Sequence, residues 1–223
     1  MNPLKTNDLP ENITIEEGAA IRLAVEEAER HSGAEVVALA LASADDYPVA
    51  SWKGAAVCGF AAAIGGAVMA PLPALGLARA SWMLLLVALG FVVGALSVVV
   101  IPPWRRWLCG HRLLERRLEQ RAREAFLVYQ VFKTRDRTGI LVAVSGFERR
   151  VAVIADEGIH AVVPEGTWQK LANETAAIVR TSGPGAGLLA AVRQAGEILA
   201  THGLARRSDD QNELPDGVRG EFR

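Results

Sequence analysis

The chain has 223 residues with 24 basic and 25 acidic side chains, so its formal net charge is −1 at pH 7. A charge so near zero gives no electrostatic reason to expect a nucleic-acid partner. Hydrophobic residues make up 51% of the chain, and the excess lies between residues 54 and 101. The two cysteines, Cys58 and Cys109, form neither a disulfide framework nor a metal-ligand spacing.

The first fifty residues predict one helix and one strand, without the apolar segment of a cleavable signal peptide. Thr14 and Glu17 form a capping box, which predicts a helix over Ile15–His31 that Gly33 ends in a left-handed conformation. The run from Glu35 to Ala42 (EVVALALA) is apolar and rich in valine and leucine. Such a run predicts a buried strand.

Two uncharged apolar runs follow, and Pro71 and Pro73 separate them. A membrane-spanning helix needs about 20 apolar residues. Trp82–Ile101 meets that length, and the first run meets it when it is counted over Trp52–Leu72. We expect a two-helix transmembrane hairpin in a lipid bilayer, and the alternative is a buried helical hairpin of a soluble protein. Tryptophans at the ends of the runs fit the membrane interface: Trp52, Trp82, Trp104 and Trp107.

Small residues recur at a spacing of four in both runs, as in Gly90 and Gly94. This spacing lets helix backbones approach closely. One interpretation is that the hairpin packs against itself. The other is a homodimer through Gly90 and Gly94.

The charges that flank the hairpin predict its orientation. Lys53 and the arginines after Trp104 lie on one side, whereas Arg79 alone lies on the other. Because basic residues favour the cytoplasmic side, we expect both termini in the cytoplasm and the protein in the inner membrane of a bacterium.

A basic amphipathic helix is expected after Pro103 and up to about Phe126. Its arginines outnumber its glutamates, and its apolar residues recur at helical spacing. Such a helix can lie on anionic lipid. It can equally cover a sheet with its apolar stripe, and both alternatives stay open.

The remaining chain predicts two strands and two helices. Thr138–Val144 and Arg150–Ala155 are apolar and joined by a short turn, which predicts an antiparallel hairpin. Helices are expected over residues 164–180 and 187–202. The last twenty residues are polar, and little structure is expected there.

The stretch Ala125 to His160 resembles the TPM domain family. The similarity lies in an Ala-Phe helix end, the entry T-x-x-R-T-G-I-L into a strand, an arginine-containing turn and a strand ending in D-x-G-I. In this chain these are Ala125-Phe126, Thr134 to Leu141, Arg149-Arg150 and Asp156 to Ile159. The resemblance implies an α/β sandwich with a small sheet between helices, and roles in assembly or repair of membrane complexes or acid phosphatase-like activity.

The expected fold class is therefore α/β, a TPM-like sandwich of a short mixed sheet between helices that a transmembrane hairpin interrupts. Residues 1–51 contribute the first helix and strand, residues 52–104 the hairpin, residues 105–203 the rest of the domain, and residues 204–223 a polar tail. All three strands should share one sheet, because a two-stranded hairpin alone is marginal.

A polar cluster is expected where the strands begin and end. Glu35 starts the first strand, Thr134, Asp136 and Arg137 precede the second, and Asp156 and Glu157 follow the third. Asp136, Asp156 and Glu157 could hold Ca²⁺ or Mg²⁺, which prefer oxygen ligands. The alternative is that the two aspartates form salt bridges with Arg135 and Arg137.

The sequence contains no G-x-S-x-G, H-E-x-x-H or phosphate-binding glycine loop. We therefore expect an interaction module, acting in assembly or maintenance or as an accessory subunit of a membrane complex, rather than an enzyme. No catalytic residue is assigned. The alternative is a weak divalent-metal-dependent phosphohydrolase.

Overall fold

The computed structural model describes residues 13–69, 76–202 and 218–220. The chain divides into two units. The α/β unit comprises residues 1–45 and 115–223, and the helical unit comprises residues 46–114. The α/β unit is thus discontinuous in sequence, and the division falls after Asp45 and Leu114.

A three-stranded mixed sheet forms the centre of the α/β unit. Its strands are β1 (Glu35–Leu41), β2 (Gly139–Ser145) and β3 (Arg150–Ala155), in the order β1-β2-β3. β1 runs parallel to β2, with Glu35 opposite Gly139. β2 and β3 pair antiparallel. The predicted antiparallel β-hairpin of β2 and β3 and the predicted single sheet of three strands are both confirmed.

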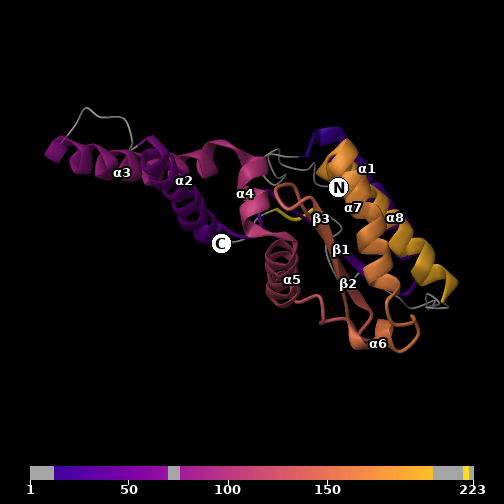
Figure 1. The fold of residues 1–223 in the computed structure, drawn as a ribbon. Coiled ribbons are helices and arrows are strands. Elements are labelled where there is room, and N and C mark those ends of the chain that lie inside the picture. Colours follow the sequence, from indigo (N-terminus) through magenta and orange to yellow (C-terminus); the bar gives the residue numbers. More distant parts are fainter. Residues whose placement is uncertain (1–12, 70–75, 203–217, 221–223) are drawn as a thin grey trace. The chain divides into compact units, whose positions relative to one another are not determined.

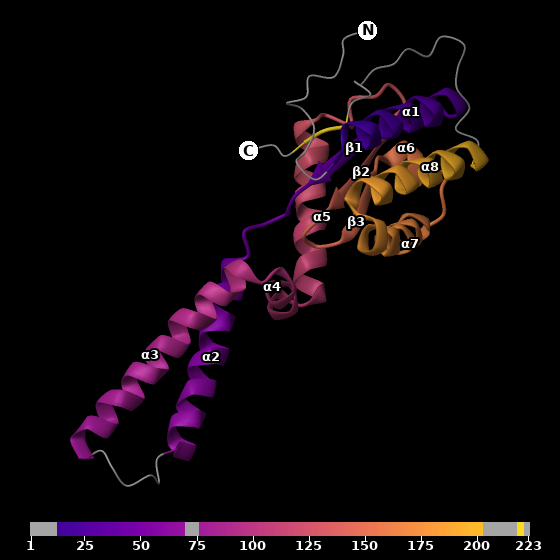
Figure 2. The same ribbon diagram turned by 90° about the horizontal axis from the view of Figure 1, so that it is seen from above.

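Helices cover both faces of this sheet, as Figures 1 and 2 show. On one face lie α1 (Ile15–His31), α7 (Thr167–Ser182) and α8 (Pro184–Thr201), and on the other lies α5 (His111–Val128). Alternate β1 side chains enter the two cores, Val36 on the α8 side and Val37 on the α5 side. Because both faces are buried, the strand reads as a continuous apolar run rather than an alternating one.

Helix α1 begins as predicted and ends differently. The Thr14 hydroxyl accepts from the Glu17 N–H at 3.2 Å, and the Glu17 carboxylate accepts from the Thr14 N–H at 2.9 Å. At the other end, the prediction of a left-handed Gly33 is wrong. Ser32 ends the helix in an extended conformation, and its N–H and hydroxyl both donate to the Ala28 carbonyl, at 3.1 and 2.8 Å.

The basic segment after Pro103 is two helices, so the prediction of a single helix is wrong. α4 (Pro102–Cys109) and α5 are interrupted at Gly110, whose φ of 74° breaks the helical conformation. Within the α/β unit, the apolar stripe of α5 covers the sheet. Leu118, Ala122 and Ala125 are buried against Val37, Leu39 and Leu141.

Little structure was predicted in the last twenty residues, and within their described part, residues 218–220, one residue pairs with the sheet edge. The Arg219 N–H donates to the Ala38 carbonyl at 2.8 Å, and the Ala40 N–H donates to the Arg219 carbonyl at 3.0 Å. Val218 is buried among the side chains of the α8 side. These contacts cover the open edge of β1. The rest of the predicted tail, residues 204–217 and 221–223, lies outside the described residues.

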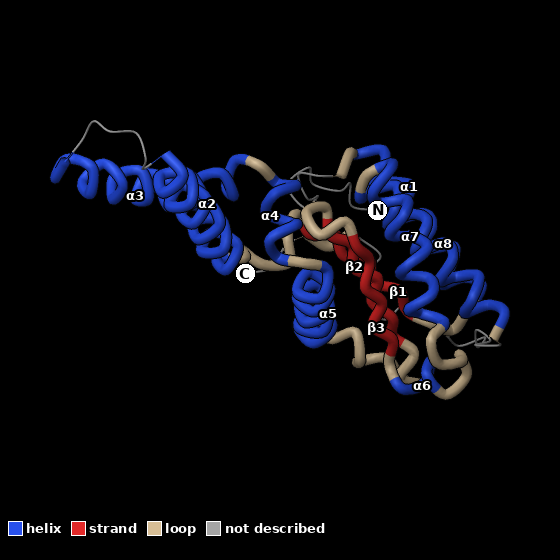
Figure 3. Tube along the Cα trace, viewed as in Figure 1, coloured by secondary structure: helices blue, strands red, loops and turns tan. Residues whose placement is uncertain are grey.

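The helical unit contains α2 (Pro48–Met69), α3 (Gly76–Val100) and α4 (Figure 3). Two of its segments are long and apolar enough to cross a membrane, Pro48–Val68 with a mean hydropathy of 1.2 and Ser81–Val100 with 2.8. α2 packs closely on α3 at Gly90 and Gly94, where an added Cβ would lie 2.8 Å from the Cys58 carbonyl oxygen and 2.2 Å from that of Gly54. Packing of this pair within one chain accounts for both glycines.

Candidate functional site

The predicted polar cluster lies at the end of the sheet where β1 and β2 begin and β3 ends. A turn precedes β2, in which the Thr138 N–H donates to the Thr134 hydroxyl at 2.9 Å. Arg137 adopts a φ of 57° in this turn. The turn is tied to the segment before β1, because the Thr138 hydroxyl donates to the Gly33 carbonyl at 2.8 Å and the Glu35 N–H donates to the Thr138 carbonyl at 3.2 Å.

Asp156 joins the end of β3 to this turn. Its N–H donates to the Gly139 carbonyl at 2.9 Å, and its Oδ1 accepts from the Glu157 N–H at 2.8 Å and so caps the short helix α6 (Glu157–His160). The Arg137 guanidinium lies 3.0 Å from the same Oδ1. The ion pair offered by the alternative interpretation of the sequence is therefore formed, between Asp156 and Arg137.

Gly158 completes the D-x-G pattern for a steric reason. Its N–H donates to the Arg137 carbonyl at 3.0 Å. A Cβ at this position would lie 2.4 Å from the Asp136 carbonyl oxygen and 2.8 Å from that of Arg137. Only glycine fits this approach. The motif that carries the family resemblance thus holds β3 against the turn before β2.

The site therefore brings together Thr134, Arg137, Asp156 and the start of β1 at Glu35. The Asp136 and Glu157 side chains are exposed at its surface. Asp156 is 6% exposed, and its Oδ2 is buried without a hydrogen-bond partner. In the described part of the chain, no group of three His, Cys, Asp or Glu side chains is arranged to hold a metal ion. A cation at Asp156 would need main-chain carbonyl oxygens as further ligands.

A second polar cluster, at the opposite end of the sheet, was not predicted. Glu148, in the turn between β2 and β3, is 4% exposed. Its Oε1 accepts from the Ala44 N–H at 2.9 Å and from the Ser43 hydroxyl at 3.3 Å, and its Oε2 accepts from the Ser145 hydroxyl. Glu148 therefore fixes the chain just after β1. One local signal points to this cluster, an acidic residue three positions after a serine in a turn.

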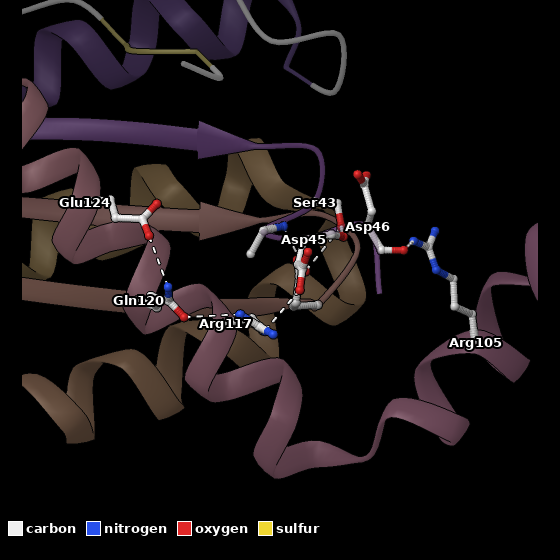
Figure 4. Close-up of polar contacts among 9 residues, drawn as sticks. Ser43, Asp45, Asp46, Arg105, Arg117, Gln120 and Glu124 are labelled. Carbon is white, nitrogen blue, oxygen red and sulfur yellow. Dashed lines mark hydrogen bonds and ion pairs between the residues drawn. The ribbon is translucent and has the colours of Figure 1, made fainter. Parts of the chain in front are cut away.

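The chain after Ser43 is also fixed by α5, as Figure 4 shows. The Arg117 Nε lies 3.0 Å from a carboxylate oxygen of Asp45. Arg117 donates to Gln120 at 3.3 Å, and Gln120 donates to Glu124 at 3.1 Å. Asp45 and Arg117 lie at the two ends of the break in the α/β unit, so this ion pair holds those ends together. In the helical unit, Arg105 donates to the Asp46 carbonyl.

Tyr129 contacts the C-terminal tail, so its ionisation reports whether the tail is bound. Its hydroxyl donates to the Gly220 carbonyl at 3.1 Å, and the Arg219 guanidinium lies 5.2 Å from its ring centre. Burial raises the pKa of Tyr129, and the positive charges of Arg219 and Arg121 oppose that rise without cancelling it.

We expect Tyr129 to ionise above the ordinary tyrosine value of about 10. Because the pKa of Tyr129 is raised in the folded state, its neutral phenol contributes to the free energy of unfolding. This contribution is complete below pH 10 and is lost as the pH rises through the folded-state pKa. The measurement is a pH titration of the absorbance at 295 nm, in which the curve of the Tyr129→Phe variant is subtracted from that of the native protein. A midpoint at or below 10 contradicts it.

Comparison with known proteins identifies a structural neighbour. Neither protein-family models nor curated proteins gave a match. The NMR structure of BA42 protein from the psychrophilic bacterium Bizionia argentinensis is similar, with a TM-score of 0.56 and 16% identity over 97% of this chain and 100% of that one. At this level of identity the similarity is one of fold.

Proposed function

We propose that this chain is a membrane-anchored TPM-like module that acts by binding other components of a membrane complex, in its assembly or maintenance or as an accessory subunit. The observation that supports membrane anchoring is the exposure of the apolar helix α3. Its segment Ser81–Val100 has a mean hydropathy of 2.8, and only 11% of it is buried. The core helix of a soluble protein would be mostly buried. Large apolar side chains are exposed along α3, among them Leu84, Leu85, Leu89, Val92 and Leu96.

The interaction role is supported by what the polar residues of the α/β unit do. Asp156 caps α6 and pairs with Arg137, while Thr134 and Thr138 close the turn before β2. Glu148 binds the chain after β1. These side chains stabilise the fold, as expected of a scaffold that presents surfaces to partners.

Purification of the tagged full chain from membranes solubilised in a mild detergent tests the role. We expect it to migrate in native gels with other membrane proteins at a defined stoichiometry. Migration with no other protein, under conditions that keep known membrane complexes intact, contradicts the proposal.

We predict that both termini face the cytoplasm of a bacterium and that the protein lies in its inner membrane. Lys53 and the arginines after Trp104 lie on one side of the hairpin, and Arg79 alone lies on the other. Alkaline phosphatase, which is active only in the periplasm, should be inactive when fused after Arg223. The matched control is a fusion between Pro73 and Ala74, which should be active. The reverse pattern contradicts the predicted orientation.

A second function is favoured by one observation, the unpartnered Oδ2 of Asp156. With the Asp136 carbonyl close to Gly158, this oxygen offers part of a Ca²⁺ or Mg²⁺ site for a weak phosphohydrolase. We predict weak calcium binding, with a dissociation constant on the order of 10⁻⁴ to 10⁻³ M.

Calorimetry of the full chain with Ca²⁺ measures this binding. Asp156→Asn combined with Asp136→Ala should abolish it, because two of the three predicted carboxylate ligands are lost while an N-cap side chain is kept at residue 156. Glu165→Ala, a change at an exposed carboxylate, is the control and should bind as the native chain does. Binding that survives the double change places the ion elsewhere.

A further inference from the structure

The two edges of the sheet differ in how they are covered. The β1 edge is paired with the chain's own tail through Arg219. On the β3 edge, no strand pairs with β3 other than β2 within the described residues. Its sequence, RVAVIA, contains none of the lysines or prolines that usually protect an open edge. Such an edge is a template for another strand.

The hydrogen-bond pattern between β2 and β3 determines which main-chain N–H and C=O groups of β3 point to the open edge. The Asp156 N–H donates to the Gly139 carbonyl, and hydrogen-bonded pairs alternate along an antiparallel ladder. The main-chain groups of Ala152 and Ile154 therefore face β2. The main-chain groups of Val151, Val153 and Ala155 point away from β2, in the plane of the sheet, and are available to an added strand.

A groove runs along this edge, between α5 and α7. Its volume is about 130 Å³, and its lining includes Leu118, Val151, Val153, Trp168 and Ala172. The Trp168 side chain is largely buried, yet its indole N–H has no hydrogen-bond partner. A buried donor without an acceptor is costly. A strand that enters the groove would supply main-chain carbonyl groups to this region.

We propose that the β3 edge binds the β3 edge of a second copy of this chain in antiparallel orientation, so that the two sheets join into one six-stranded mixed sheet. A two-fold axis at Val153 pairs the outward groups of Val153 with their own counterparts, and those of Val151 with Ala155 of the second copy. This register joins three hydrogen-bonding pairs across the interface. It also places Arg150 of each copy opposite Asp156 of the other.

Charge selects this register over its neighbours. In the Val153 register, Arg150, which lies 3.7 Å from Glu115 of its own chain, is opposite Asp156 of the second copy. The Oδ1 of that aspartate pairs with Arg137 within its own chain, and its Oδ2 has no hydrogen-bond partner there. A shift by two residues in either direction leaves two outward pairs instead of three. It also places Arg150 opposite Ile154, or Asp156 opposite Ala152. The interface is distinct from the alternative of a homodimer through Gly90 and Gly94, and it does not depend on the membrane location.

Cysteine cross-linking of the full chain in detergent tests the register, in a background with Cys58→Ala and Cys109→Ala. The Cα atoms of the two copies of residue 153 would be about 5.5 Å apart, within the range for a disulfide. We expect Val153→Cys to form a disulfide dimer on mild oxidation. Val151→Cys alone should yield at least tenfold less, and should cross-link when it is mixed with Ala155→Cys.

A second measurement needs no added cysteine. Light scattering of the native full chain should show a dimer whose dissociation constant rises about tenfold in Arg150→Glu, because that change places two acidic residues face to face. Arg149→Glu makes the same charge change one residue before β3 and should leave the constant unchanged.

Three results would overturn the proposal. The first is a chain that stays monomeric at all concentrations, and this holds also when hydrogen exchange shows that a different partner protects Val151 and Val153. The second is equal cross-linking at residues 151 and 153. The third is a dimer that Arg150→Glu leaves intact and that substitution of Gly90 or Gly94 disrupts.

Discussion

Replacement of Gly94 with valine is expected to separate α2 from α3 and to destabilise the helical unit by about 3 kcal/mol, the upper end of the usual cost of overpacking. An added Cβ would lie 2.2 Å from the Gly54 carbonyl oxygen and 2.7 Å from the Gly54 carbonyl carbon. Both atoms belong to the backbone of α2, so the clash cannot be relieved by a side-chain rotation. Unfolding in mixed detergent micelles, followed by circular dichroism, measures the loss.

The matched control is Gly65→Val, on the same helix pair. A Cβ at Gly65 meets no atom within 4 Å. Valine has a higher helix propensity than glycine, so this variant should be as stable as the native chain or slightly more stable. Equal destabilisation of both variants would show that the close approach at Gly94 is not what joins the helices.

Removal of residues 1–45 is expected to abolish cooperative folding of the α/β unit. β1 provides seven residues that pair with β2, and all seven are buried. Without them, Ile140, Val142 and Val144 lose their neighbouring strand, and α8 loses the contact of α1 at Gly196 and Ala28. Two strands with one antiparallel pairing are marginal in isolation.

A chain in which a short flexible linker joins Asp45 to Glu115 is the control. The Asp45–Arg117 ion pair shows that these ends are close, so the closure costs little entropy. We expect a single thermal transition for the linked chain and none for residues 115–223 alone. If the two melt at the same temperature, β1 and α1 are dispensable.

The sequence predicted the elements whose signal is local. The capping box at Thr14, the apolar run from Glu35 and the hairpin of β2 and β3 each depend on neighbours a few residues away. At the strand-end site, the same local patterns indicated that Arg137 and Asp156 lie near each other, because the turn before β2 and the end of β3 share one end of a hairpin.

The features that were missed depend on distant residues. The interruption at Gly110 lies inside a continuous helical pattern, which does not show where a glycine takes a positive φ. Glu148 binds Ser43 and Ala44, which precede it by about a hundred residues. Arg219 pairs with β1 from within a polar segment, since pairing through the main chain leaves little trace in side-chain composition.

The order of the strands in the chain has a consequence for biosynthesis. About a hundred residues, including both apolar helices, separate β1 from its partner β2. At ribosomal rates of about 5 to 20 residues per second, β1 waits roughly 5 to 20 s for that partner. During that interval the run EVVALAL has no strand to pair with and is prone to aggregate. Cells that make this protein are thus expected to need a chaperone on the nascent N-terminal segment until the second half of the chain emerges.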